Sequence, residues 1–156
     1  MWKGDIRKEL LLFNMSKISA ATKLLYVNHS LHTNLEARSG IKEFFYDKPW
    51  ATVINQPVKY STFLNDIRKH KFIICPEGNA IDCHRNWEVL YMRRVPVMKN
   101  NIYLKKLYRN LPVLFVDEFS DVSEELLIQN NHIYQQALTF DMKRSEEHTS
   151  ELQSRQ

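Results

Sequence analysis

The strongest constraint on the fold comes from residues 72–98, in which two short apolar runs flank a turn and a helical pattern. The first run, 72–75, ends in a turn that contains Gly78, and glycine favours tight turns. Helical periodicity covers residues 82–93, and the second apolar run follows at 95–98. A strand, a turn, a helix and a strand in this order predict a βαβ unit, with its polar turn at the carboxyl end of a parallel sheet.

The rest of the chain repeats this alternation, which is typical of an α/β fold. The predicted strands cover residues 23–28, 50–54, 71–75, 95–98 and 111–116. The predicted helices cover residues 1–19, 34–45, about ten residues from Ser61, 82–93, 102–110 and a last helix that opens at Ser123. The expected N-caps are Asn34 or Thr33, Ser61 and Asp82. We therefore expect a Rossmann-like parallel sheet with helices on both faces.

The length of 156 residues suits one compact domain. We expect residues 1–22 to form a helical lead-in and residues 23–143 to form the α/β domain. Residues 144–156 form a polar tail without apolar periodicity, which we expect to be disordered. The tail resembles the translation of a common sequencing adapter, so we expect it to be an artefact rather than part of the native protein.

The composition is that of an ordinary globular protein, with 44% hydrophobic and 26% charged residues. No apolar run is long enough to span a bilayer, and the N-terminus lacks the apolar core of a signal peptide. Two cysteines are too few for a disulfide framework and suit a reducing compartment. These features predict a cytoplasmic protein without a transmembrane segment.

The net charge of +4 is a weak excess, which favours anionic ligands or peripheral contact with a membrane. The densest basic groups, at 69–71, 93–94 and 105–106, are interpreted as solvated faces. No aromatic and basic motif accompanies them, so nucleic acid is not an expected partner. The spacing of Cys75 and Cys83 matches no usual zinc pattern, so no metal site is expected.

The predicted helix at 82–93 carries His84, Arg85 and Glu88 close together. Spacings of three and four residues place these side chains on neighbouring faces of one helix. Taken alone, the spacing favours a surface salt bridge. Trp87 belongs to the apolar stripe of the same helix and is expected in the core.

The segment resembles the donor-sugar half of exostosin-like glycosyltransferases and their smaller microbial and viral relatives. Those chains typically carry Pro-x-Gly-Asn-Gly-x-Asp, then His-Arg-x-Trp-Glu-Ala-Leu, then a short Ile-Pro-Ile-Val strand. The matching residues here are Pro76, Gly78, Asn79, Asp82, His84, Arg85, Trp87, Glu88, Leu90 and Pro96. A weaker resemblance extends over residues 23–127. It includes the loop after the first strand, where relatives often have Asn-x-Ser-x-x-Thr-Asn and then an arginine.

The resemblance implies one Rossmann-like lobe of a GT-B type fold that binds a nucleoside-diphosphate sugar. It implies that Gly78 and Asn79 let the backbone approach the diphosphate. It also implies that Arg85 contacts phosphate, which suits its planar guanidinium, and that Glu88 accepts hydrogen bonds from ribose hydroxyls. The other residues assigned to the donor site are Asn28, Arg38, Asp82 and His84, with Arg38 as a second phosphate contact.

The resemblance therefore implies transfer of a sugar from a nucleoside-diphosphate donor to a glycan acceptor, without a metal or other cofactor. No catalytic residue is assigned, and the chain is expected to be a fragment without the acceptor lobe. The alternative is a non-catalytic nucleotide-binding or structural module. The chain departs from the family pattern at Glu77 in the turn expected to face phosphates, at Ala80 in place of a glycine, and at Arg93 with Arg94 in place of a Gly-Cys pair. Glu77 and the arginine pair favour the alternative.

Overall fold

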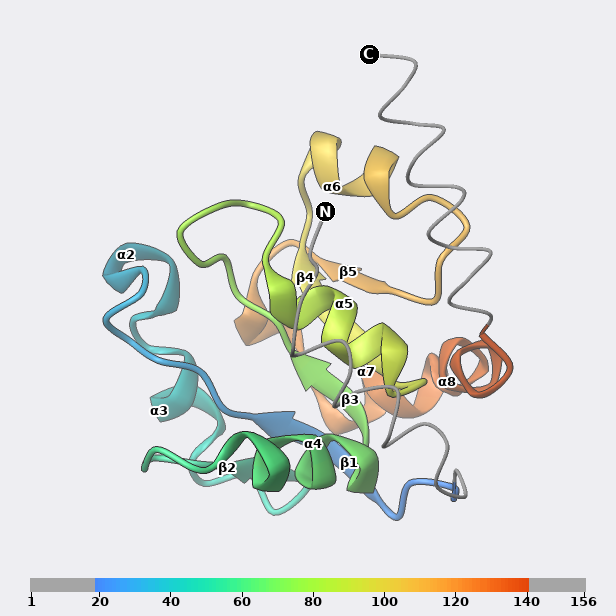
Figure 1. Ribbon diagram of the computed structural model, residues 1–156, viewed down its shortest axis with the longest axis horizontal. Coiled ribbons are helices and arrows are strands. Elements are labelled where there is room, and N and C mark those ends of the chain that lie inside the picture. The colour runs from blue at the N-terminus through green and yellow to red at the C-terminus, as the bar shows by residue number, and fades with distance from the viewer. Residues whose placement is uncertain (1–18, 141–156) are drawn as a thin grey trace.

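The computed structural model describes residues 19–140, which contain one all-parallel sheet of five strands in the order β2-β1-β3-β4-β5 (Figure 1). The strands are β1 (Lys23–Val27), β2 (Ala51–Val53), β3 (His70–Ile74), β4 (Val95–Lys99) and β5 (Leu114–Val116). The central strands are buried on both faces, which explains why their sequences are nearly continuous apolar runs.

Helices cover both faces of the sheet. On one face, α4 (Tyr60–Lys69), α5 (His84–Tyr91) and α6 (Ile102–Leu107) form a hydrophobic cluster with inward-facing residues of the strands such as Tyr26 and Ile73. On the other face, α3 (Ile41–Phe45), α7 (Glu124–Gln129) and α8 (Asn131–Leu138) pack on the alternate strand residues, such as Leu25 and Phe72. The prediction of a Rossmann-like α/β fold is confirmed.

The strand order places a topological switch point between β1 and β3. The chain leaves β1 toward β2 on one side and leaves β3 toward β4 on the other side. In open parallel sheets, ligands bind at the carboxyl ends of the strands where the order reverses. The segment 75–83 follows β3 at this edge, and Figure 1 shows it as a loop that projects beyond the strand before the chain enters α5.

Two helix starts differ from the prediction. Helix α4 begins at Tyr60 after Lys59, so Ser61 is not its cap, and α5 begins at His84 after Cys83, so Asp82 is not its cap. The Asp82 carboxylate instead accepts hydrogen bonds from residues of α5 and from Tyr108, as described below.

The predicted helix at 34–45 consists of two short helices, α2 (Leu35–Arg38) and α3, separated at Gly40. Gly40 has a φ of 81°, a left-handed conformation that a glycine adopts without strain and that ends a helix. Asn34 caps α2 as expected, since its Oδ1 accepts from the Ala37 backbone N–H at 3.1 Å. The last predicted helix is also two helices, α7 and α8, which follow a 3-10 turn at Phe119–Asp121.

The interpretation of the basic pair at 93–94 as a solvated face is wrong for Arg94, which is fully buried. Its guanidinium donates to backbone carbonyls of Ser19, Arg68 and Arg93, and Arg68 lies in the last turn of α4, where carbonyls lack helical partners. Arg93 has a φ of 58°, in the left-handed region that favours glycine.

The predicted helix at 1–19 and the tail at 144–156 lie outside the described residues, apart from Ser19 itself. Among the helices within residues 19–140, none combines the length and the apolar character that a membrane crossing requires.

Candidate functional site

The loop after β1 and the segment 75–83 are joined by Arg38, which is 6% exposed. Its Nε donates to the Glu77 carbonyl at 2.8 Å, its Nη1 to the Ser30 carbonyl at 2.7 Å, and its Nη2 to the Pro76 carbonyl at 3.4 Å. Arg38, predicted as a phosphate contact, is therefore already engaged by three carbonyls. Its charge remains uncompensated, because carbonyl acceptors carry no net charge.

Gly78 permits the close approach of this arginine. A Cβ atom at Gly78 would lie 3.3 Å from the Arg38 Nη2 and 3.5 Å from the Thr33 methyl carbon. The Gly78 carbonyl also accepts from Asn34 Nδ2 at 3.0 Å. The absence of a side chain at Gly78 thus lets two loops pack together, while the neighbouring Asn79 is exposed.

Arg85 lies at the switch point between β1 and β3. Its Nη1 donates to the backbone carbonyl of Asn28 at the end of β1, and its guanidinium lies 4.9 Å from the centroid of the Phe63 ring. Burial lowers the pKa of Arg38 and of Lys42, and the positive charge of Arg85 is the second cause of both shifts. Arg38, Lys42 and Arg85 are called the basic cluster below.

Among residues 19–140, no ion pair joins a carboxylate to Arg38, Lys42 or Arg85, although Glu88 acts on Arg85 and Glu43 on Lys42 from a greater distance. Like charges held this close repel one another, and a bound anion would relieve that repulsion. The cluster is drawn from α2, α3 and α5, and only tertiary structure brings these elements together.

His29 lies among these cations and is 3% exposed. Neither Nδ1 nor Nε2 of its ring has a hydrogen-bond partner of normal geometry, although the backbone of Arg38 lies close enough to favour the protonated ring slightly. Burial, and then the charges of Arg85, Lys42 and Arg38, lower the pKa of His29 to about 3. The ring is therefore neutral at physiological pH.

Glu88 lies one turn along α5 from Arg85 and is 7% exposed. Its carboxylate accepts a hydrogen bond from the Tyr60 hydroxyl at 2.7 Å. Burial raises the pKa of Glu88, and the Tyr60 hydrogen bond and the charges of Arg85 and His84 oppose that shift. His84 is exposed at the first position of α5.

The side chain of Asn28 belongs to a hydrogen-bonded chain on the same edge of the sheet. Its Nδ2 donates to the Tyr26 hydroxyl at 2.9 Å, and that hydroxyl donates to Asp66 Oδ2 at 2.8 Å. Asn28 thus supports the basic cluster in two ways: its carbonyl binds Arg85, and its side chain fixes the end of β1 against α4.

Asp82 anchors the end of the segment 75–83. Each of its carboxylate oxygens lies 3.2 Å from the indole Nε1 of Trp87, and its Oδ1 also accepts from the Tyr108 hydroxyl. Trp87 is 4% exposed and stacks on Tyr108 at a centroid distance of 4.8 Å, which confirms its predicted place in the core. The carboxylate of Asp82 therefore satisfies two buried donors.

A cavity of about 680 Å³ opens on the other side of the segment 75–83 and is called the rim cavity. It is lined by Asn34, Glu36, Ala37, Ser39, Gly40, Ile41, Phe44, Cys75, Glu77, Ile81, Met98, Lys99, Asn100, Leu104, Glu118, Phe119 and Ser120. None of the predicted donor-site residues lines it. Glu77, which the sequence placed in a turn facing the phosphates, lines this cavity instead.

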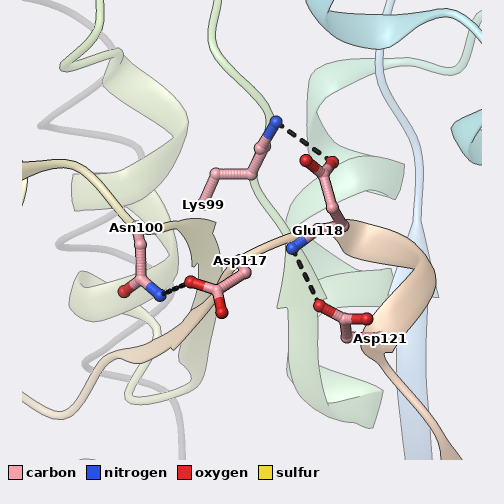
Figure 2. Close-up of polar contacts among 5 residues, drawn as sticks. All are labelled: Lys99, Asn100, Asp117, Glu118 and Asp121. Carbon is pink, nitrogen blue, oxygen red and sulfur yellow. Dashed lines mark hydrogen bonds and ion pairs between the residues drawn. The ribbon is translucent and has the colours of Figure 1, made fainter.

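The ends of β4 and β5 contribute Lys99, Asn100 and Glu118 to the lining of the rim cavity, and Figure 2 shows the polar contacts of these residues. Lys99 Nζ lies 3.1 Å from a Glu118 carboxylate oxygen, and Asn100 Nδ2 donates to the Asp117 carboxylate. Asp121 accepts from the Glu118 backbone N–H at 3.1 Å and closes the 3-10 turn after β5. The one lysine that lines the cavity is thus paired, and the excess charge there is negative.

The structure brings Asn28, Arg38 and Arg85 together and leaves Asn79 and His84 exposed at the edge. Lys42 was not predicted as a site residue, and His29 was not predicted to lie beside the arginines. The spacing of four residues between Arg38 and Lys42 is no helical signal, because Gly40 ends one helix and begins the next between them.

No protein-family model and no curated protein sequence matches the chain. Within the part of the chain that the structure describes, no group of three or more His, Cys, Asp or Glu side chains converges to hold a metal ion.

Proposed function

We propose that this chain is the donor-binding lobe of a glycosyltransferase, which transfers a sugar from a nucleoside-diphosphate sugar to a glycan acceptor. The observation that carries the proposal is the basic cluster. Arg38, Lys42 and Arg85 lie near one another at the switch point of a parallel sheet, and none of them forms an ion pair with a carboxylate among residues 19–140. A diphosphate is an anion that such a site would attract.

The partly exposed Arg85 and Lys42 would contact the diphosphate, while Arg38 would act through its field. No side chain caps α5, so its N-terminal dipole would add to the attraction. Glu88 would accept a hydrogen bond from a ribose hydroxyl in place of the Tyr60 hydroxyl. During transfer, negative charge grows on the departing diphosphate, and the basic cluster would stabilise that charge without a metal ion.

The alternative function is a non-catalytic nucleotide-binding module. It is favoured by the engagement of Arg38 and Asn28 in internal hydrogen bonds, which leaves fewer groups to hold a substrate in a reactive geometry. The two functions differ in turnover: the module binds nucleotide but neither hydrolyses nor transfers the sugar of a nucleotide-sugar donor.

Calorimetric titration with uridine and guanosine diphosphate, in the presence of a chelator, tests the proposal. We expect weak binding to the wild type and at least tenfold weaker binding to Arg85→Ala, since a charge-assisted hydrogen bond contributes about 1.5–3 kcal/mol. Arg109→Ala is the matched control, because Arg109 is an exposed arginine after α6, and it should bind like the wild type. An absence of binding at millimolar nucleotide refutes the proposal.

A further inference from the structure

His29 is an exception to the rule that buried polar groups are hydrogen-bonded. Both of its ring nitrogens are buried without a hydrogen-bond partner, in a loop where neighbouring polar side chains such as Asn28 and Asn34 are paired. An unpaired buried polar group destabilises the folded state, so its presence calls for a physical reason.

The charged groups that act on His29 come from three helices: Arg38 of α2, Lys42 of α3 and Arg85 of α5. All three are cations, and no carboxylate is among the groups with the largest influence on the ring. A protonated imidazole would be a fourth positive charge in this cluster. The ring therefore stays neutral while the basic cluster is empty of anions.

We propose that His29 takes up one proton when a tetrahedral dianion occupies the basic cluster, so that the anion and the proton bind together. The dianion reverses the sign of the charge around the ring, and the imidazolium is then stabilised rather than repelled. The proton comes from the solvent and binds to the unprotonated ring nitrogen. The proposal takes from the proposed function only the identity of the anion, a phosphate group of a nucleoside diphosphate.

Linkage between the two binding events makes the coupling reciprocal. If the anion strengthens proton binding at His29, protonation of His29 must strengthen anion binding by the same factor, so the affinity for the anion rises as the pH falls. Uptake of one proton corresponds to an affinity that rises up to about tenfold for each pH unit. A released nucleoside diphosphate carries more negative charge than the sugar donor, so the coupling would be stronger for the product.

Sulfate is a suitable probe, because it remains a dianion between about pH 5 and 8 and so adds no titration of its own. Calorimetry of sulfate binding at pH 6, in two buffers with different heats of ionisation, gives the number of protons taken up. We expect close to one proton for the wild type and none for His29→Gln. His29→Gln should still bind sulfate at pH 8, where its affinity should match that of the wild type.

Two controls separate His29 from its neighbours. His32→Gln changes an exposed histidine of the same loop, and His84→Gln changes the exposed histidine at the start of α5. Both should retain the proton uptake. Loss of the uptake in His84→Gln but not in His29→Gln would assign the proton to His84 and overturn the proposal.

The remaining outcomes are also decisive. Sulfate binding without proton uptake in the wild type refutes the coupling but leaves nucleotide binding intact. Binding of uridine diphosphate without any binding of sulfate refutes the basic cluster as the anion site. If His29→Gln does not fold, the imidazole ¹⁵N shifts of the wild type with and without sulfate give the protonation state of His29 directly, and unchanged shifts overturn the proposal.

Discussion

The two sides of the segment 75–83 differ in charge. They are neighbouring regions, since only this short stretch of chain lies between them. On the β1 side lies the basic cluster, in which no carboxylate of residues 19–140 pairs with a cation. On the β4 and β5 side lies the rim cavity, which Glu36, Glu77 and Glu118 line and whose lysine is paired (Figure 2). An anion is therefore attracted to one side of the segment and repelled from the other.

A single turn separates these two electrostatic environments. Arg38 binds the carbonyls of Pro76 and Glu77, so the backbone of the turn faces the basic cluster at this point. Glu77 at the same place lines the rim cavity. Because the turn is held from both ends, by Arg38 and by Asp82, the two environments remain separate only while the turn is fixed.

The largest effect is expected from loosening that turn with Asp82→Ala. The substitution leaves the Trp87 indole N–H and the Tyr108 hydroxyl buried without an acceptor. Each unsatisfied donor costs about 1–3 kcal/mol, so we expect a loss of about 3 kcal/mol in the free energy of unfolding, measured by urea denaturation. Asp82→Asn keeps an acceptor oxygen and should lose less. A loss below about 1 kcal/mol for Asp82→Ala would show that the turn is held by other contacts.

The second effect is a fall in stability at acid pH that originates at His29, which is buried beside the basic cluster. The pKa of His29 is lowered to about 3 in the folded state, from about 6.5 in the unfolded chain. The unfolded chain therefore binds more protons between these values, and the contribution to stability, complete above pH 6.5, is lost as the pH falls through that window. The loss is up to about 1.4 kcal/mol per pH unit, or about 2 kcal/mol at pH 5.

His29→Gln tests the origin of this loss. Burial also lowers the pKa of His70, which acts in the same direction, so the His29→Gln variant should retain part of the pH dependence. We expect the difference in unfolding free energy between pH 7 and pH 5 to shrink in His29→Gln and to stay unchanged in His32→Gln. Equal slopes in all three proteins would show that His29 is not shielded from solvent protons.

Most of the fold was predictable, because each central strand is a short apolar run bounded by turn residues and followed by a helical pattern. The differences between the predicted and the observed structure arise from contacts between residues that are distant in the sequence. Asp82 has the sequence of an N-cap, but Tyr108 and Trp87 engage its carboxylate, and Tyr108 is 26 residues away. Arg94 belongs to a charged pair of the kind that is usually solvated, but the unpaired carbonyls at the end of α4 bind it in the interior.

Only those residues of the candidate site that belong to a local sequence motif were predictable. The pattern of residues 76–96 led us to predict Arg85, and the loop after β1 led us to predict Arg38, but nothing local indicated that Lys42 and His29 lie beside them. The rim cavity has no local signal at all, because its lining comes from α2, α3, the turn and the ends of β4 and β5. Charge patterns along a sequence do not show which side of a turn each side chain will occupy.

The third effect is a difference in salt dependence. Raising the ionic strength screens the basic cluster, so nucleotide affinity should weaken by about 1 kcal/mol, or roughly fivefold, between low salt and about 0.5 M. Glu118→Gln changes the charge of the rim cavity without touching the basic cluster, and should alter neither the affinity nor its salt dependence. Calorimetry at two salt concentrations measures both. A marked change of affinity in Glu118→Gln would mean that the nucleotide lies in the rim cavity.

The smallest effect is expected from Gly78→Ala, at the point where the turn contacts the basic cluster. The added Cβ would lie 3.3 Å from Arg38 Nη2, closer than most contacts of this kind, so the guanidinium must shift by a few tenths of an ångström. The Nη2 hydrogen bond to Pro76 is already long at 3.4 Å, whereas the Nε and Nη1 bonds are short, so the shift weakens one bond and keeps two.

We therefore expect Gly78→Ala to lower the free energy of unfolding by less than about 1 kcal/mol, since it weakens a single hydrogen bond of about that net strength. Ala80→Gly, at an exposed position two residues further along the turn, is a control for the backbone entropy of glycine and should also cause only a small change. Thermal denaturation of both variants gives the comparison. A loss of several kcal/mol in Gly78→Ala would mean that Arg38 cannot move, and that the arginine holds the turn more rigidly than Asp82 does.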